Sequence, residues 1–259
     1  MSQSSSEAKA APGRPEAVWL RRTPSTNDEV KKLALAGAPE WTAVVADRQD
    51  AGRGRLGRSW HSDGPWGLWA SYLLRPRLEP EKAPFLGILA GLAAALAIRR
   101  LTGLAALVKW PNDVQVDGLK VCGVLPEAGI GPSGLEWVVI GAGMNLNEPP
   151  HPMPDEIRAR ATTLEALCGK RIERSAMLSE MLDIMQGLYD GFVSGGPDRA
   201  LDLAGRMSAL GEGVITVLEG GKSYGAKALG MDEYGALLVE DDCGRRRRLL
   251  SAEVSIRSR

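Results

Sequence analysis

The chain has 259 residues, in which 32 Lys and Arg are balanced by 32 Asp and Glu, and 44% of the residues are hydrophobic. Zero net charge excludes a protein held to nucleic acid by bulk charge, whereas this length and apolar content suffice for one large domain or two smaller ones. Three cysteines without a CxxC pair and two histidines far apart in the sequence fit neither a disulfide framework nor a zinc site, so we expect a reducing, cytoplasmic setting.

Residues 1–16 lack aromatic and β-branched residues, which predicts a flexible tail without a secretory signal. We then predict strands at Ala17–Arg21, Thr42–Asp47, Leu68–Leu74, Ala106–Lys109, Asp113–Val116, Lys120–Leu125 and Leu135–Asn145, and helices at Asn27–Ala36 and Pro80–Leu101. The apolar run Phe85–Ile98 is shorter than the roughly 20 residues that span a bilayer, so it predicts a buried helix. Connections that are mostly hairpins, one of them at Asp117-Gly118, predict a mixed α/β (α+β) fold with a mostly antiparallel sheet and helices on one face.

The C-terminal part of the chain changes character. Helices are predicted at Thr162–Leu167, Ser175–Val193 and Ala200–Met207, and strands at Val214–Leu218, Ser223–Leu229, Ala236–Glu240 and Arg246–Leu250. The short strands between turn signals are typical of a small all-β meander or barrel. We therefore predict one domain at residues 17–208 and a second at residues 209–259.

The segment Gln49–Arg58 alternates glycines with arginines directly after a predicted strand. Glycines permit close backbone approach, and guanidinium groups bind carboxylate or phosphate oxygens in a fork. These properties predict an anion-wrapping loop that is mobile until a multiply charged ligand draws it closed, because ordering about ten residues costs on the order of 10 kcal/mol. An exposed turn or an RNA-binding patch explains the loop alone equally well.

A second polar segment follows Lys109. Pro111 fixes its own φ, so Asn112 and Asp113 are expected at a turn leaving a strand. An asparagine can read an adenine edge and an aspartate can hold a metal or an arginine, although ordinary turn chemistry also accounts for the pair. Lys120, among apolar neighbours, must extend to solvent or find an anion.

Two further segments invite a ligand. The glycines of Val138–Asn147 interrupt an apolar strand, where a ligand or another backbone could approach closely, but the segment is not a dinucleotide fingerprint because no GxGxxG opens a helix there. Thr26 and Glu29 have the spacing of a capping box, which predicts that Thr26 caps a helix.

In chain order these motifs, Ser-Thr-Asn at 25–27, GRGRLGR at 52–58, KWPND at 109–113, GLKVCG at 118–123 and IGAGMNLN at 140–147, resemble those of the biotin protein ligases. The resemblance is close over residues 17–147 and looser in the C-terminal β module. It implies a catalytic domain related to class II aminoacyl-tRNA synthetases, followed by a small SH3-like barrel. Family members that repress transcription carry an N-terminal helix-turn-helix domain, and the short polar tail here predicts the type without one.

The resemblance also implies a two-step reaction. Biotin and ATP, with Mg²⁺ as activator, give biotinyl-5′-AMP and pyrophosphate, and biotin then passes to a lysine of a biotin carboxyl carrier protein or domain of an acyl-CoA carboxylase. We expect no DNA or membrane partner and either a monomer or a homodimer. The metal ligands stay unassigned.

Roles are implied residue by residue. Catalytic roles are implied for Arg55, Asp113 and Lys120. Biotin binding is implied for Ser25, Thr26, Asn27, Gln49, Gly52, Arg53, Gly54, Arg55, Lys120 and Gly123. Nucleotide binding is implied for Arg55, Arg58, Asn112, Asp113 and Asn145.

Three alternatives are weighed against this assignment. A lipoate ligase shares the fold and adenylate chemistry but typically has an RRxSGGG-type segment and a following histidine, both missing here. A non-catalytic sensor of biotin or nucleotide would keep the same pocket. A nucleic-acid module would use the arginine loop and Arg245–Arg248, but Glu240–Asp242 lie across a predicted hairpin turn, where they can form cross-strand ion pairs.

Overall fold

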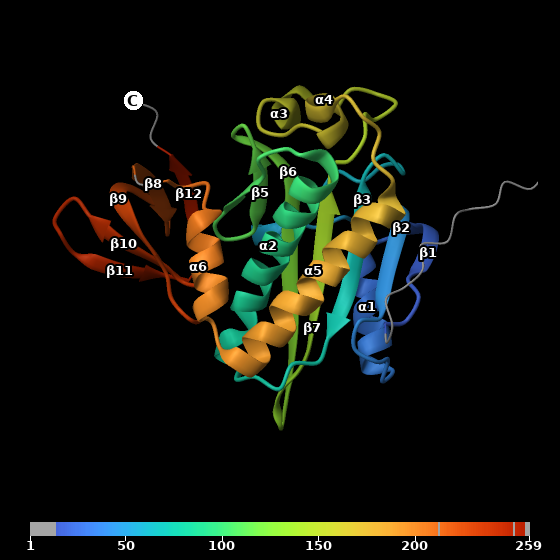
Figure 1. Ribbon diagram of the computed structural model, residues 1–259, viewed down its shortest axis with the longest axis horizontal. Helices are drawn as coiled ribbons and strands as arrows, with labels where there is room; N and C mark the ends of the chain where they lie inside the picture. The colour runs from blue at the N-terminus through green and yellow to red at the C-terminus, as the bar shows by residue number, and fades with distance from the viewer. Residues whose placement is uncertain (1–13, 212, 251, 257–259) are drawn as a thin grey trace, which may run out of the picture.

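The computed structural model describes residues 14–211, 213–250 and 252–256, so the predicted flexible tail lies outside the described residues apart from positions 14–16. The chain forms two sheets that stand side by side (Figure 1). The larger sheet has the strand order β1-β2-β3-β7-β6-β5-β4, and the smaller has the order β11-β10-β9-β8-β12.

The larger sheet comprises β1 (Val18–Thr23), β2 (Ala43–Gln49), β3 (Leu68–Leu74), β4 (Leu107–Lys109), β5 (Asp113–Val116), β6 (Leu119–Gly131) and β7 (Gly134–Met144). The α-helices are α1 (Thr26–Leu35), α2 (Ala83–Thr102), α3 (Asp155–Arg158), α4 (Leu164–Cys168), α5 (Arg174–Gly195) and α6 (Asp198–Arg206). The smaller sheet comprises β8 (Val214–Glu219), β9 (Lys222–Met231), β10 (Leu237–Asp241), β11 (Arg246–Leu249) and β12 (Glu253–Ile256).

The mixed, mostly antiparallel sheet is confirmed. In the larger sheet only β1 and β2 pair in parallel, and α1 connects them as a crossover. The predicted hairpin between β5 and β6 is also confirmed, because Asp117 and Gly118 both have positive φ, at 50° and 79°, as a two-residue turn of this kind requires.

The prediction that helices cover one face of the sheet is wrong, because its central strands are apolar on both faces. Val44, Leu73 and Val139 pack under the α1 residues Val30 and Ala34. Alternate positions on the same strands, among them Val45, Tyr72 and Ile140, belong to the larger core that includes α2 and α5. Side chains alternate along a strand, so a strand buried on both faces needs a helix on each side.

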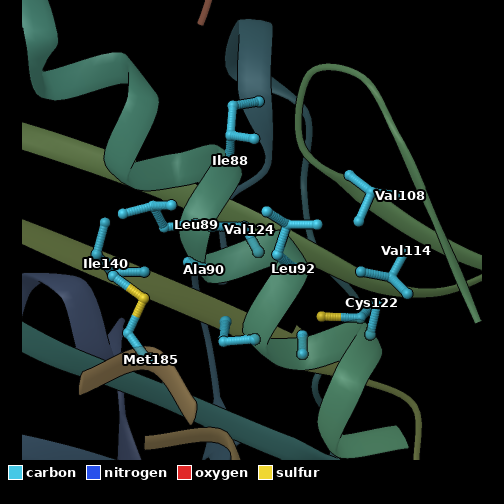
Figure 2. Close-up of a cluster of buried hydrophobic side chains, with 14 of the residues drawn as sticks. Ile88, Leu89, Ala90, Leu92, Val108, Val114, Cys122, Val124, Ile140 and Met185 are labelled. Atoms are coloured by element: carbon cyan, nitrogen blue, oxygen red, sulfur yellow. The ribbon is translucent and has the colours of Figure 1, made fainter. Parts of the chain in front are cut away.

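Helix α2 is the predicted buried helix, which packs on the sheet beside α5. In Figure 2 its residues Ile88, Leu89 and Leu92 extend among side chains of the sheet, and Met185 of α5 lies close by. The segment Pro80–Thr102 is long and apolar enough to cross a membrane, but most of it is buried inside the protein. Its apolar character is therefore explained by packing on two sides.

The C-terminal sheet contains the four predicted strands and a fifth, β12, that the sequence patterns missed. β12 is four residues long and pairs with β8 at one edge of the sheet, a long-range contact that local patterns do not reveal. The predicted ion pairing across the β10–β11 turn is confirmed, since Arg246 contacts Glu240, and Arg247 contacts Asp241.

Hydrogen bonds connect the end of β4 with the C-terminal part of the chain. The indole Nε1 of Trp110, which follows β4, donates a 2.9 Å hydrogen bond to the carbonyl of Gly235, in the turn between β9 and β10, and the Val108 amide donates at 2.7 Å to the carbonyl of Met207, which directly follows α6. Trp110 is almost fully buried. The smaller sheet is therefore fastened to the strand that precedes the KWPND turn.

Shortening a buried side chain of α2 tests how strongly the stability of the core depends on this helix. Leu92→Ala should lower the free energy of unfolding by about 2–5 kcal/mol, because Leu92 is fully buried and its loss leaves a cavity. Leu101→Ala, in the same helix but 44% exposed, should cost less than about 1 kcal/mol. Urea unfolding followed by circular dichroism measures both, and equal losses would contradict this description of the core.

Candidate active site

A strip of the larger sheet without side chains forms the floor of the site. Strand register places Gly123 of β6 opposite Gly143 of β7, and Leu125 opposite Gly141. A Cβ at Gly143 would lie 2.5 Å from the Trp60 ring, and one at Gly141 would lie 2.2 Å from Oδ1 of Asn27. The glycines are therefore required because Trp60 and Asn27 lie directly on the strands.

The same register extends this row to charged residues. Asp113 of β5 pairs with Gly123, and Lys109 of β4 pairs with Asp113. The Nζ of Lys120 lies 2.6 Å from Oδ1 of Asp113 and 5.0 Å from the centre of the Trp60 ring. The lysine thus finds an anion, one of the two outcomes that its apolar surroundings predict, and it also makes a cation–π contact.

The start of α1 forms a polar corner beside this floor. Oε1 of Gln49 accepts hydrogen bonds from the amide of Thr26 at 2.8 Å and from its hydroxyl at 3.1 Å. Oγ of Ser71 lies 2.7 Å from the Thr26 hydroxyl and donates to Oδ1 of Asn27 at 2.6 Å. Each amide side chain is therefore oriented by its neighbours.

The predicted capping box is wrong. Ser25, not Thr26, precedes the helix, and no side chain caps it. Oε1 of Glu29 instead accepts from the Thr23 hydroxyl at 2.9 Å. Gln49, which is distant in sequence, accepts the hydrogen bond of the Thr26 hydroxyl, which lines the site.

The Gly-Arg segment folds into a compact turn, residues 52–60, which we call the flap. The Gly54 amide donates to the Arg58 carbonyl at 2.7 Å, and the Trp60 amide donates to the Gly52 carbonyl at 2.8 Å. Leu56, at the tip, has a φ of 57° and is 70% exposed. The mobility expected from the sequence stays a prediction, and the structure shows which contacts hold the flap in one conformation.

The arginines of the flap take different directions. Arg53 forms two hydrogen bonds to Asp28, at 2.6 and 2.7 Å, which hold the pKa of that carboxyl group below its usual value. Arg55 donates to Oδ1 of Asn112 at 3.3 Å, and burial lowers the pKa of its guanidinium group although the nearby Asp113 opposes the shift. Arg53 thus faces α1, and Arg55 faces the KWPND turn.

These elements enclose a pocket of about 210 Å³. Its charged lining consists of five cations and one carboxylate, namely Arg53, Arg55, Arg58, Lys109, Lys120 and Asp113. Such an excess of positive charge over a low-dielectric floor favours a polyanionic ligand. No group of three or more His, Cys, Asp and Glu side chains that could hold a metal occurs among the residues described.

Most of the residues proposed from the sequence line this one pocket. They are Ser25, Thr26, Asn27, Gln49, Arg53, Gly54, Arg55, Arg58, Asn112, Asp113, Lys120 and Gly123. Gly52 and Asn145 lie outside the lining. A Cβ at Gly52 would meet the Trp60 carbonyl at 2.6 Å, so this glycine serves the fold of the flap. Asn145 is buried and donates to the Thr162 carbonyl at 3.1 Å, which anchors the segment after β7.

Several site residues were not singled out from the sequence. Ser71 lies between Trp69 and Tyr72 in an otherwise apolar strand, and a serine in such a strand is a sequence signal for a polar site. Trp60 lines the pocket, and its buried indole Nε1 has no hydrogen-bond partner in the described part of the chain. Ala252, just before β12, and Val254 of β12 also line the pocket, and no local pattern connects this strand to the site.

Comparisons with known proteins agree with this geometry. The model of the biotin/lipoate A/B protein ligase family matches residues 19–145, and that of the biotin protein ligase C-terminal domain matches residues 209–257. A biotin protein ligase from Aquifex aeolicus, solved in complex with biotin and ATP, is 32% identical with a TM-score of 0.79, and the alignment covers 93% of this chain and 98% of that chain.

Two curated relatives extend the likeness. The biotin--[acetyl-CoA-carboxylase] ligase of Paracoccus denitrificans is 37% identical over 87% of this chain and 95% of its own length. The bifunctional ligase/repressor BirA of Bacillus subtilis (strain 168) is 36% identical over 90% of this chain and 71% of its own length. The fold and the pocket therefore define a protein of the biotin and lipoate ligase class. Within that class, the chain belongs to the biotin protein ligase family.

Filling the glycine floor should disturb the site. Gly143→Ala places a methyl group against the Trp60 ring, and we expect a loss of about 1–3 kcal/mol in the free energy of unfolding from overpacking. Gly187→Ala is the control, because nothing lies within 4 Å of its Cβ position in α5, and alanine there should stabilise the helix by up to about 1 kcal/mol. Thermal and urea unfolding measure both variants, and an undisturbed Gly143→Ala protein would contradict the contact.

Proposed function

We propose that this protein is an ATP-dependent biotin protein ligase that makes biotinyl-5′-AMP and transfers biotin to a lysine of a carrier protein. The observation that carries the proposal is that one pocket contains both the polar corner, with its oriented amide side chains, and a group of cationic side chains. The polar corner can bind a neutral ring with donors and acceptors, and the cationic side chains can bind carboxylate and phosphate groups. Family membership and a solved relative that holds both biotin and ATP support it.

In the first step an oxygen of the biotin carboxylate attacks the α-phosphorus of ATP, and pyrophosphate leaves. Both reactants are anions, so fixed cations must offset their repulsion and stabilise the charge that builds up on oxygen. Lys120 and Arg55 are the residues that we assign to this task, since both line the pocket and converge near Asp113. One such ion pair near 4 Å is worth about 4 kcal/mol at an effective dielectric of about 20, before desolvation.

We assign the ureido ring of biotin to the polar corner, which comprises Ser25, Thr26, Asn27 and Gln49. The exposed donors and acceptors of that ring match a corner in which both amide side chains are fixed by hydrogen bonds. Trp60 at the end of the flap and Asn112, which accepts from Arg55 of the flap, are suited to the nucleotide, and the indole N–H of Trp60, which has no partner among the described residues, offers a donor to a ligand. Asn145 supports the site from behind through its bond to Thr162.

A magnesium ion fits this pocket only when it is bound together with the nucleotide. Mg²⁺ keeps several waters and takes one or two carboxylates together with substrate phosphates, and Asp113 is the carboxylate in the described lining that could contribute. When bound, the ion would neutralise charge on the β- and γ-phosphates.

In the second step the unprotonated amine of a carrier lysine attacks the acyl carbonyl. An amide bond forms, and AMP leaves with the oxygen that biotin had supplied to the anhydride. We assign the carrier to the biotin carboxyl carrier protein or domain of an acyl-CoA carboxylase, and the protein to the cytoplasm. Residues 17–208 form the catalytic unit in this proposal, and residues 209–259 complete it.

Cys122 plays no part in this chemistry. It lies next to the glycine floor, but its side chain is buried in the core on the other face, where burial raises the pKa of its thiol to about 12. A thioester intermediate on this residue would therefore lack both access and a thiolate.

Pyrophosphate release on addition of biotin and ATP tests the proposal. We expect release with biotin, little with lipoate, and transfer of biotin to a purified carrier domain. Binding of biotin without pyrophosphate release would instead identify a sensor, and faster release with lipoate would identify a lipoate ligase.

Removing the Lys120 side chain should impair the activation of biotin. Lys120→Ala should slow pyrophosphate release by about 100-fold, the usual cost of one preorganised donor, while Lys120→Arg keeps the charge and should recover part of the rate. Lys222→Ala removes an exposed lysine of β9 outside the pocket and should leave the rate unchanged. A wild-type rate for Lys120→Ala would remove this residue from the mechanism.

Removing the inward-facing arginine should weaken retention of the intermediate. Arg55→Ala should slow activation and release reactive biotinyl-5′-AMP into solution, which biotinylates a bystander protein without a carrier sequence. Arg77→Ala removes an exposed arginine outside the pocket and should not increase bystander labelling. Full activity with full retention in Arg55→Ala would contradict its assigned role.

A further inference from the structure

We propose that Asp28 is a positioning residue of the site: together with Glu127 it holds the flap closed over the pocket by binding Arg53. This inference rests on the proposed function only where it concerns retention of the adenylate. The contact itself is a property of the fold.

The anchor is a bidentate pair within a network of four charges. Both carboxylate oxygens of Asp28 accept from Arg53, at 2.6 and 2.7 Å, and Oε2 of Glu127 lies 3.4 Å from the same guanidinium group. Lys31 lies 2.5 Å from Oε1 of Glu127 and 3.6 Å from Asp28. The two acids and two bases neutralise one another, so the network holds the flap without competing for an anionic ligand.

The network joins three separate elements. Asp28 and Lys31 belong to the first turns of α1, Glu127 belongs to β6, and Arg53 is the part of the flap that reaches them. In contrast, Arg55 turns toward Asn112 across the pocket. The flap is therefore fastened on one side and presents its cations to the ligand on the other.

Glu127 links this anchor to the amide corner. Its Oε2 accepts from Nδ2 of Asn27 at 2.6 Å, and the same amide group donates to the Leu125 carbonyl at 3.3 Å. With Ser71 donating to Oδ1, the Asn27 amide has its orientation set from both ends. The acids that fasten the flap thus also fix a residue that we assign to the ring of biotin.

Asp28 is about one-third exposed, so solvent weakens the pair but does not abolish it. Breaking a bidentate pair of this exposure should raise the opening rate of the flap by about three- to tenfold. Opening by local unfolding of the flap breaks the hydrogen bonds of the Gly54 and Trp60 amides, which both lie within residues 52–60, and exposes these amides. Global unfolding, in contrast, would also expose the Leu73 amide, which donates to Thr42 in the sheet.

Hydrogen exchange of the full-length protein, with Asp28→Asn as the main variant, tests the anchor. We expect exchange at Gly54 and Trp60 to become about three- to tenfold faster while exchange at Leu73 is unchanged. Asp28→Glu keeps the charge and should recover part of the protection. The double variant D28N/R53M should exchange no faster than R53M, because the pair is already broken in the single variant.

Asp202→Asn is the matched control, since it breaks an exposed ion pair with Arg206 on α6. It should leave exchange in the flap unchanged. Unaltered exchange at Gly54 and Trp60 in Asp28→Asn, or acceleration that includes Leu73, would overturn the anchor.

A second measurement, the dissociation rate of preformed biotinyl-5′-AMP, tests its role in retention. We expect dissociation from Asp28→Asn to accelerate by about the factor seen in exchange. An open flap with an unchanged dissociation rate would overturn the role in retention. If the wild-type protein forms no adenylate, the proposed function fails, and hydrogen exchange alone still decides whether Asp28 holds the flap.

Discussion

The site depends on the absence of side chains at three neighbouring positions on one face of a sheet. Gly123, Gly141 and Gly143 leave a strip of bare backbone on which Asn27 and Trp60 rest within van der Waals contact. Any larger residue there would lift these two side chains away from the strands. The polar corner and the cationic row are therefore placed by the sheet, and their spacing is as fixed as its register.

The other face of the same strands explains why that strip is rigid. Residues next to the glycines along the strands, among them Val124, Ile140 and Ala142, belong to the core beneath α2. Figure 2 shows α2 running across these strands with its leucines among them. Because a strand alternates its side chains, one segment supplies both a full core and an open floor. A close-packed interior behind the floor resists its displacement, which suits a site that must hold like charges together.

The sequence predicts the strands and helices well, because each is encoded by local periodicity and turn residues. The strands Leu68–Leu74 and Asp113–Val116 have the bounds predicted for them. Motif order and the resemblance it carries identify most of the residues that line the pocket. The contacts of Ser71, Asp28 and Glu127 join positions 25 to 100 residues apart, and the pairing of β12 with β8 joins the first and last strands of the smaller sheet in the sequence. Such contacts depend on tertiary packing, which local patterns do not describe, and the failed capping box shows a distant glutamine prevailing over a local rule.

The smaller sheet is a wall of the pocket and not an appendage. Val254 of β12 faces the ligand space, while the turn after β9 receives the indole N–H of Trp110, whose ring lines the same space. A chain that stopped after α6 would expose an apolar flank and leave a buried donor without an acceptor. During synthesis, a competent pocket therefore becomes complete only when β12 has left the ribosome, and a fragment released before it would be unable to sequester a reactive anhydride.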